Sequence, residues 1–132
     1  YQVNRWNQTT VWFQKIISLS PRTQGCYLIT DEILSNIGAE IKQVEAGLCN
    51  ILLHHTSAGL ILMENCDPTV RTDMKNFFNK IAPEGKNLYE HDDEGPDDMP
   101  AHIKSALTGV SLSIPINKGR LMLGTWQGIW LM

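Results

Sequence analysis

The sequence predicts an α+β fold in which a mostly antiparallel β-sandwich or partly closed barrel carries two or three inserted helices. About eight short runs rich in β-branched, aliphatic or aromatic residues are spread over the whole chain. Helical patterns interrupt these runs instead of alternating with them, which argues against a doubly wound parallel sheet. With 132 residues, the chain is predicted to be a single domain over 1–132.

The first third of the chain predicts three strands around one helix. The strands are predicted at Thr9–Leu19, Cys26–Ile29 and Ile41–Val44. Thr30 or Asp31 can cap a helix whose apolar positions fall on one face, and Gly38 is a typical helix stop.

The middle of the chain predicts two strands followed by a helix. Gly47–His55 is uniformly apolar, which favours a central strand, and Gly59–Glu64 is a second strand. Asp67 is a typical N-cap with Pro68 at the first helical position, so a helix is expected to run to about Ile81. Its predicted buried positions are Val70, Met74, Phe77 or Phe78, and Ile81.

The last third predicts a short helix and then three strands. Pro100 can open a helix over Ala101–Thr108. The strands are predicted at Val110–Ile116, Arg120–Leu123 and Thr125–Leu131. Residues 117–119 (Asn-Lys-Gly) are typical of a hairpin turn, which would join the first two of these strands. Trp126 and Trp130 are expected to be buried in the core or in a subunit interface.

The stretch Tyr89–His102 is the first candidate for chemistry. It holds six of the 14 acidic residues and two of the four histidines. Its glycine and prolines exclude one continuous helix. Because His91 and His102 supply imidazole nitrogen and the carboxylates supply hard oxygen, this stretch can bind a divalent cation, zinc or magnesium. The alternative is a solvated acidic loop.

A second histidine-bearing stretch, His54–Ser57, ends the predicted central strand. Adjacent strand residues point to opposite faces, so only one of the two histidines can face a given pocket. Thr56 and Ser57 are either ordinary turn residues or, beside the first amides of the Pro68 helix, phosphate contacts. Asp67 is fully explained as an N-cap, and a functional role needs its carboxylate to reach a ligand as well.

Composition and residue spacing indicate which kinds of partner and which cellular compartment to expect. The chain has no basic run, so a nucleic-acid partner is not expected, and no apolar run has the length of a membrane span. The three cysteines lie far apart without a CxxC pair, which favours free thiols and a cytoplasmic location.

Five motifs occur in a familiar order and spacing. They are His55-Thr56-Ser57-Ala58, Glu64-Asn65-Cys66-Asp67-Pro68, Tyr89-Glu90-His91-Asp92, residues 97–104 (DDMPAHIK) and residues 124–129 (GTWQGI). Together they resemble the YjbQ-like family, whose members are named secondary thiamine phosphate synthases. The resemblance covers the chain from about Thr10 to Met132. It implies a small β-rich fold, a homotrimer, and a polar pocket that holds a metal.

The resemblance also implies roles for individual residues. The candidate catalytic residues are His55, Asp67, Asp98 and Gln127. The candidate phosphate-binding residues are Thr56, Ser57, Gly124 and Thr125. The candidate metal ligands are His91 and His102. Family members usually continue with a further segment and a final strand, which this sequence, ending at Met132, is expected to lack.

The activity implied first is that of a thiamine phosphate synthase, which joins a pyrimidine pyrophosphate to a thiazole phosphate and releases pyrophosphate. Negative charge builds on that leaving group, so a cation or hydrogen-bond donors must stabilise it. The same residues would serve a trimeric protein that binds a phosphorylated metabolite without turnover. They would also serve a metal-dependent hydrolase with an open position for water.

Overall fold

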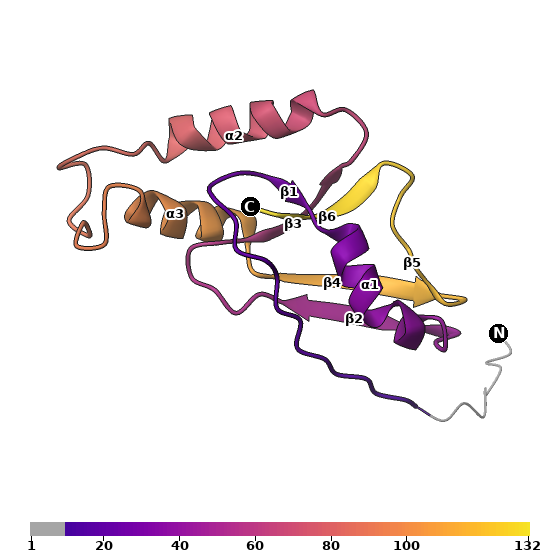
Figure 1. Cartoon of the computed structure of the whole chain (residues 1–132). Coiled ribbons are helices and arrows are strands. Elements are labelled where there is room, and N and C mark those ends of the chain that lie inside the picture. The colour runs from indigo at the N-terminus through magenta and orange to yellow at the C-terminus, as the bar shows by residue number, and fades with distance from the viewer. Residues whose placement is uncertain (1–9) are drawn as a thin grey trace, which may run out of the picture.

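The computed structural model describes residues 10–132, and this range contains three helices and six strands (Figure 1). The helices are α1 (Thr30–Ile41), α2 (Thr69–Ile81) and α3 (Asp98–Thr108). The strands are β1 (Tyr27–Leu28), β2 (Ala46–Leu52), β3 (Leu60–Glu64), β4 (Ser111–Asn117), β5 (Arg120–Leu121) and β6 (Gln127–Leu131). They form two antiparallel sheets, ordered β1-β6-β3 and β2-β4-β5, that are not closed into a barrel. The predicted α+β class is confirmed.

The core lies where the two sheets meet α1. Its buried members are Ile29, Ile33, Leu60, Ile114 and Ile129, which come from both sheets and from α1 and its N-terminal boundary. The Leu53 N–H donates to Val110 O just beyond the paired residues of β2 and β4, and the Leu60 N–H of β3 donates to Gly109 O. Residues 109–110 therefore contact both sheets just before β4 begins. The chain therefore passes from α3 into β4 at the junction of the sheets.

The prediction for β4 and its hairpin is confirmed. Ile114 and Ile116 are buried, while the residues between and beside them face solvent. Lys118 and Gly119 both have positive φ, 48° and 73°, and form a two-residue loop between β4 and β5. This is the geometry that a primed hairpin turn requires.

Two predicted strands near the N-terminus are not strands. Residues 10–19 pair with neither sheet, and Thr9 lies outside the described residues; a β-rich composition forms a strand only where a partner edge is available. The prediction at Ile41–Val44 is wrong because α1 continues through Gly38 to Ile41. Ile33 and Ile41 are both buried, so the apolar face outweighs the low helix propensity of the glycine.

The prediction that residues 47–55 form a central strand is also wrong. β2 lies at the edge of its sheet, and β4 is the central strand. Leu48 on β2 is 63% exposed. An apolar run indicates that a strand is buried, but it does not identify the element that covers it.

Helix α2 begins as predicted but does not pack as predicted. The Thr69 N–H donates to Asp67 Oδ1 at 2.8 Å, so Asp67 acts as the cap and Pro68 opens the first turn. None of the residues of α2 is buried, and Phe77 is 55% exposed. The helix stands above α3 and the β1-β6-β3 sheet in Figure 1, so the predicted burial of its apolar face is wrong.

Helix α3 begins at Asp98, three residues earlier than predicted. Pro100 occupies the first turn, where N–H groups lack an intrahelical acceptor, so proline is tolerated there. Trp130 is buried as predicted, whereas Trp126 is 61% exposed. In the part of the chain that the structure describes, no helix has the length and apolar character needed to cross a membrane.

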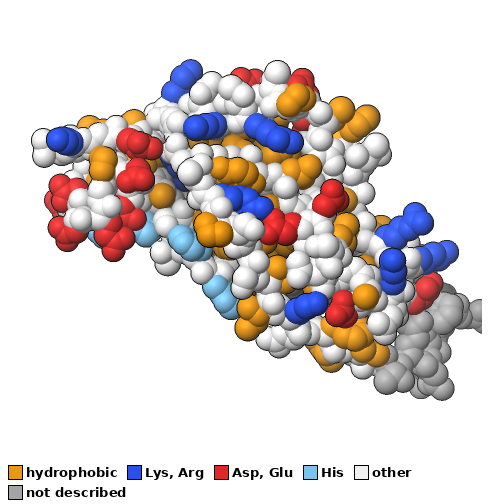
Figure 2. All heavy atoms as spheres, in the orientation of Figure 1, with side chains coloured by type: hydrophobic (Ala, Val, Ile, Leu, Met, Phe, Trp, Pro, Cys, Tyr) orange, Lys and Arg blue, Asp and Glu red, His pale blue; other side chains and the backbone are white. Residues whose placement is uncertain are grey.

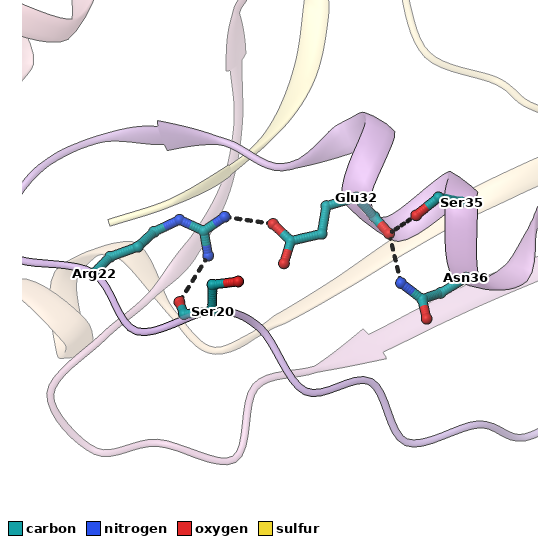
Figure 3. A network of polar contacts seen from close by, with 5 residues as sticks. All are labelled: Ser20, Arg22, Glu32, Ser35 and Asn36. Atoms are coloured by element: carbon teal, nitrogen blue, oxygen red, sulfur yellow. Dashed lines mark hydrogen bonds and ion pairs between the residues drawn. The ribbon is translucent and has the colours of Figure 1, made fainter.

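The N-terminal end of α1 is held by tertiary contacts. Thr30 does not cap the helix; its Oγ1 accepts the Ile129 N–H at 2.8 Å and so ties α1 to β6. Figure 3 shows Arg22 reaching the carboxylate of Glu32 and donating to the carbonyl oxygen of Ser20. This network fixes the loop before β1 on α1. All three cysteines are free, as predicted.

Candidate functional site

Two of the predicted residues, Asp98 and His102, lie one turn apart on the same face of α3. Their spacing of four residues brings the carboxylate and the imidazole together on the helix surface. His91 comes from the loop before α3, and its Nε2 lies 2.7 Å from Asp98 Oδ2. The ligand atoms of the three residues lie within 4.8 Å of one another. We call this group the His-Asp-His cluster. Figure 2 shows acidic side chains gathered at one end of the molecule, with histidines beside them.

The Asp98 carboxylate has one oxygen that lies beside two imidazole nitrogens. Its side chain is 13% exposed, and Oδ2 is buried. The partners of Oδ2 among residues 10–132 are two imidazole nitrogens, His91 Nε2 at 2.7 Å and His102 Nε2 at 3.4 Å, which form ion-pair contacts without the full geometry of a hydrogen bond. A buried carboxylate oxygen needs a donor or a positive charge beside it, and either an imidazole N–H or a cation between the three ligand atoms would supply one.

His102 is oriented by the turn after β2. Its Nδ1 lies 2.8 Å from the carbonyl oxygen of Thr56. A carbonyl only accepts, so Nδ1 carries the proton and Nε2 points toward Asp98. The hydrogen bond to Thr56 raises the pKa of His102, desolvation opposes the shift, and the charge of Asp98 adds to it. Metal-binding histidines commonly show this arrangement, in which the other ring nitrogen donates to a carbonyl.

The turn at residues 55–58 is fixed to α3 by a second contact. Ser105 Oγ donates to the carbonyl oxygen of Ala58 at 2.7 Å. Within the turn, the Ser57 N–H donates to His55 Nδ1 at 3.0 Å, and Ser57 Oγ lies 3.3 Å from the same atom. Because Nδ1 of His55 accepts, a neutral His55 carries its proton on Nε2 and can donate it to a ligand.

The predicted site residues not yet described lie near the end of β3 that is distant from the 55–58 turn. Leu60 pairs with Leu131 near the 55–58 turn, whereas Glu64 pairs with Gln127 at the far end. A five-residue strand spans roughly 13 Å, so the two ends form separate groups within one chain. The far group contains Asp67, Gly124, Thr125 and Gln127.

Within the far group, the observed contacts are structural. Gln127 Oε1 accepts the Gly124 N–H at 2.8 Å and closes the turn before β6. Asp67 Oδ1 accepts from both the N–H and the Oγ1 of Thr69, and the backbone hydrogen bond is the larger cause of the lowered pKa of Asp67. The catalytic roles of Asp67 and Gln127 and the phosphate-binding roles of Gly124 and Thr125 stay predictions.

One concave region was missed in the sequence. A cavity of about 510 Å³ lies between the loop before β1, α2 and α3, and Ser57 and His55 reach its wall. Its polar lining includes Lys75, Asn79 and Lys104. The signal that could have found it is the helical spacing of Lys75, Phe78 and Asn79, which places two polar side chains beside an aromatic one on a single face of α2.

Comparisons with known proteins agree on one family. A family model described as UPF0047 protein YjbQ-like matches residues 15–132. The chain is 55% identical over 121 residues to UPF0047 protein YjbQ of Escherichia coli O157:H7, covering 92% of this chain and 86% of the relative. It is 56% identical, with the same coverage, to UPF0047 protein YjbQ of Salmonella typhimurium. Among solved structures, it is similar to an uncharacterized conserved protein of the YjbQ/UPF0047 family from Clostridium acetobutylicum, with 34% identity, a TM-score of 0.73, and coverage of 86% of this chain and 84% of that chain.

Proposed function

Because this chain belongs to the UPF0047 YjbQ-like family, we propose that it is a metal-dependent enzyme acting on a small phosphorylated metabolite, with a transferase reaction like that of thiamine phosphate synthase as the first candidate. One observation carries the metal dependence. Asp98 Oδ2 is buried and lies 2.7 Å and 3.4 Å from two imidazole nitrogens, so three potential ligand atoms lie within 4.8 Å of one another.

The donor set supports zinc over magnesium. His91 Nε2, Asp98 Oδ2 and His102 Nε2 would hold the ion, and two imidazoles with one carboxylate suit zinc, whereas magnesium prefers oxygen ligands. Three protein ligands leave a position for a substrate oxygen or water. When bound, the ion would stabilise negative charge on the oxygens of a leaving pyrophosphate.

The protein groups around the cluster have separate tasks in this proposal. Thr56 orients His102 through its carbonyl group. His55, with its proton on Nε2, can donate a hydrogen bond to a phosphate oxygen. Asp98 supplies the negative charge that balances the ion. A metal-dependent hydrolase is the second candidate, because the open position would equally hold an attacking water.

We also propose that the protein is a homotrimer. Support comes from apolar side chains that the described chain leaves uncovered on β2 and on the segment before β1. They include Leu48, Leu52, Trp12 and Ile16. A second and third copy would cover this surface and the free edge of β2.

The first experiment measures metal content and turnover together. Purified wild-type protein and the His91→Ala and His102→Ala variants are analysed by elemental mass spectrometry, with His54→Ala as the control. Loss of either ligand should lower bound zinc by at least about tenfold, whereas His54→Ala should leave it unchanged. Unchanged zinc in both ligand variants would contradict the metal site.

Turnover then separates the candidate reactions. Pyrophosphate release that requires both a pyrimidine pyrophosphate and a thiazole phosphate, and that stops after chelation, supports the transferase. Phosphate or amide hydrolysis from a single substrate supports the hydrolase. Binding of a phosphorylated metabolite without any turnover would leave only a binding protein.

A further inference from the structure

The cavity beneath α2 is formed by one face of each neighbouring helix. Helix α2 contributes Lys75, Phe78 and Asn79, which share the spacing of one helical face. Helix α3 contributes Ala101, Lys104 and Thr108, which also share one face, and Asp97 borders the cavity from the residue before the helix. We call this space the α2–α3 cavity. It lies on a different face of α3 from Asp98 and His102.

The walls of the α2–α3 cavity are held by contacts far apart in the sequence. The loop at residues 19–25 lines one side, and the contact of Arg22 with Glu32 fixes this loop on α1 (Figure 3). Gln24 in the same loop donates to Asn79 of α2 at 3.1 Å and to Glu84 at 3.1 Å. The volume, about 510 Å³, falls in the usual range for small-molecule sites. On α2, only the face that carries Lys75, Phe78 and Asn79 borders this cavity.

The hydrogen bonds inside the cavity leave donors without acceptors. Lys104 Nζ donates to Asn79 Oδ1 at 2.8 Å, and Gln24 Nε2 donates to the same oxygen. An ammonium group can only donate, so this contact fixes which end of the Asn79 amide is oxygen. The Asn79 Nδ2 group and the other two Lys104 N–H bonds have no acceptor among the described residues.

The charges in the cavity favour a ligand that carries negative charge, and such a ligand would also accept hydrogen bonds from these donors. Lys104 is partly buried, which lowers its pKa, and the charge of Lys75 is close enough to lower it further. The carboxylates of Glu84 and Asp97, which also line the cavity, raise the pKa of Lys104, and the effect of Glu84 is larger than that of Lys75. Arg22, Lys75 and Lys104 together outnumber these two acids in the lining, so its formal charge is positive. Two ammonium groups that repel each other are stabilised by an anion between them. Figure 2 shows Lys and Arg side chains in the middle of the face, apart from the acidic end.

We propose that the α2–α3 cavity binds the phosphate group of a small phosphorylated metabolite, with Lys104, Lys75 and the Asn79 amide as its donors. The apolar walls, which include Phe78 and Tyr27, take the uncharged body of the same ligand. His55 and Ser57 also line the cavity, so a ligand there reaches toward the turn that orients His102. This inference rests on the proposed function for the class of ligand, and it adds the residues that hold the phosphate.

The test measures binding of inorganic phosphate and pyrophosphate by calorimetry. Lys104→Met should weaken binding by about tenfold or more, since it removes a charged hydrogen bond. Asn79→Asp keeps the acceptor for Lys104 and Gln24 but replaces donors by negative charge, so it should weaken binding while the melting temperature stays near that of the wild type. Lys80→Met, on α2 outside the cavity, is the matched control and should bind as the wild type does.

The outcomes separate this inference from the proposed function. His102→Ala should lose zinc but keep phosphate binding in the cavity. Phosphate binding that His102→Ala abolishes and Lys104→Met leaves unchanged would place phosphate on the metal and overturn the cavity site, while the proposed function would stand. Wild-type protein that binds acetate but neither phosphate nor pyrophosphate would overturn the choice of phosphate, and turnover would still test the reaction separately.

Discussion

The Nδ1 atom of His102 on α3 lies 2.8 Å from the carbonyl oxygen of Thr56, 46 residues earlier in the chain. This one contact joins the two histidine-bearing stretches, because Thr56 follows His55 and His102 faces Asp98. It also commits the proton of His102 to Nδ1 and leaves Nε2 for a cation. The orientation of the His-Asp-His cluster therefore depends on the turn after β2.

The raised pKa of His102 predicts a pH-dependent stability of the metal-free protein. A raised pKa in the folded state means that protonated His102 stabilises folding below its ordinary pKa of about 6.5. This stabilisation is lost as the pH rises through the folded-state pKa. The difference in melting temperature between chelator-treated wild type and His102→Gln should therefore shrink as the pH rises. A difference in melting temperature that stays constant as the pH rises would contradict a stabilising role for protonated His102.

The capping role of Asp67 predicts a graded series of variants. Asp67→Ala should lower the melting temperature by a few degrees, and Asp67→Asn and Asp67→Ser should restore most of it, because both accept the Thr69 hydrogen bonds. The pKa of Asp67 is lowered, so its stabilisation is present above the unfolded-state pKa and is lost as the pH falls through the folded-state pKa. We expect Asp67→Asn to keep wild-type zinc content and pyrophosphate affinity. Loss of either in a stable Asp67→Asn protein would show that the carboxylate reaches a ligand.

Two glycines predict opposite effects of the same substitution. A Cβ at Gly59 would lie 1.8 Å from Thr108 Oγ1 and 2.9 Å from the Gly109 carbonyl oxygen. Gly59→Ala should destabilise the protein by about 1–3 kcal/mol and, by moving the 55–58 turn, lower zinc affinity. Gly38 lies inside α1 with no described atom within 4 Å of a new Cβ, so Gly38→Ala should stabilise by about 0.5–1 kcal/mol. Urea unfolding measures the change in the free energy of unfolding for both variants. A Gly59→Ala protein as stable as the wild type would contradict the close approach of Gly59 to Thr108.

The uncovered surface of β2 predicts the proposed assembly. Light scattering at micromolar concentration should give the mass of three chains, and Leu48→Lys should reduce it because a charge would be buried in the interface. Phe77→Lys, at a similarly exposed position on α2, is the control and should leave the mass unchanged. A monomeric wild type would exclude the trimer.

The sequence by itself determined the features that depend on neighbouring residues. The Asp67-Pro68 start of α2, the alternation of β4 and its two-residue hairpin follow from capping, side-chain periodicity and turn chemistry, which act over a few residues. The residue types of the His-Asp-His cluster could also be predicted, because imidazole nitrogen and carboxylate oxygen in one short stretch are a candidate ligand set before their positions are known.

Only the tertiary structure decided which of these features meet. Local patterns cannot show that β4 rather than β2 is central, because apolar composition indicates burial and not the partner. They also cannot separate Gln127 from His102, since the two lie at opposite ends of β3 only after the sheet has formed. The contact of Thr56 with His102 and the α2–α3 cavity likewise depend on how α2 and α3 pack above the sheet. Contacts of this kind join residues that are far apart along the chain, so their geometry is set by topology and packing, which no short window of sequence contains.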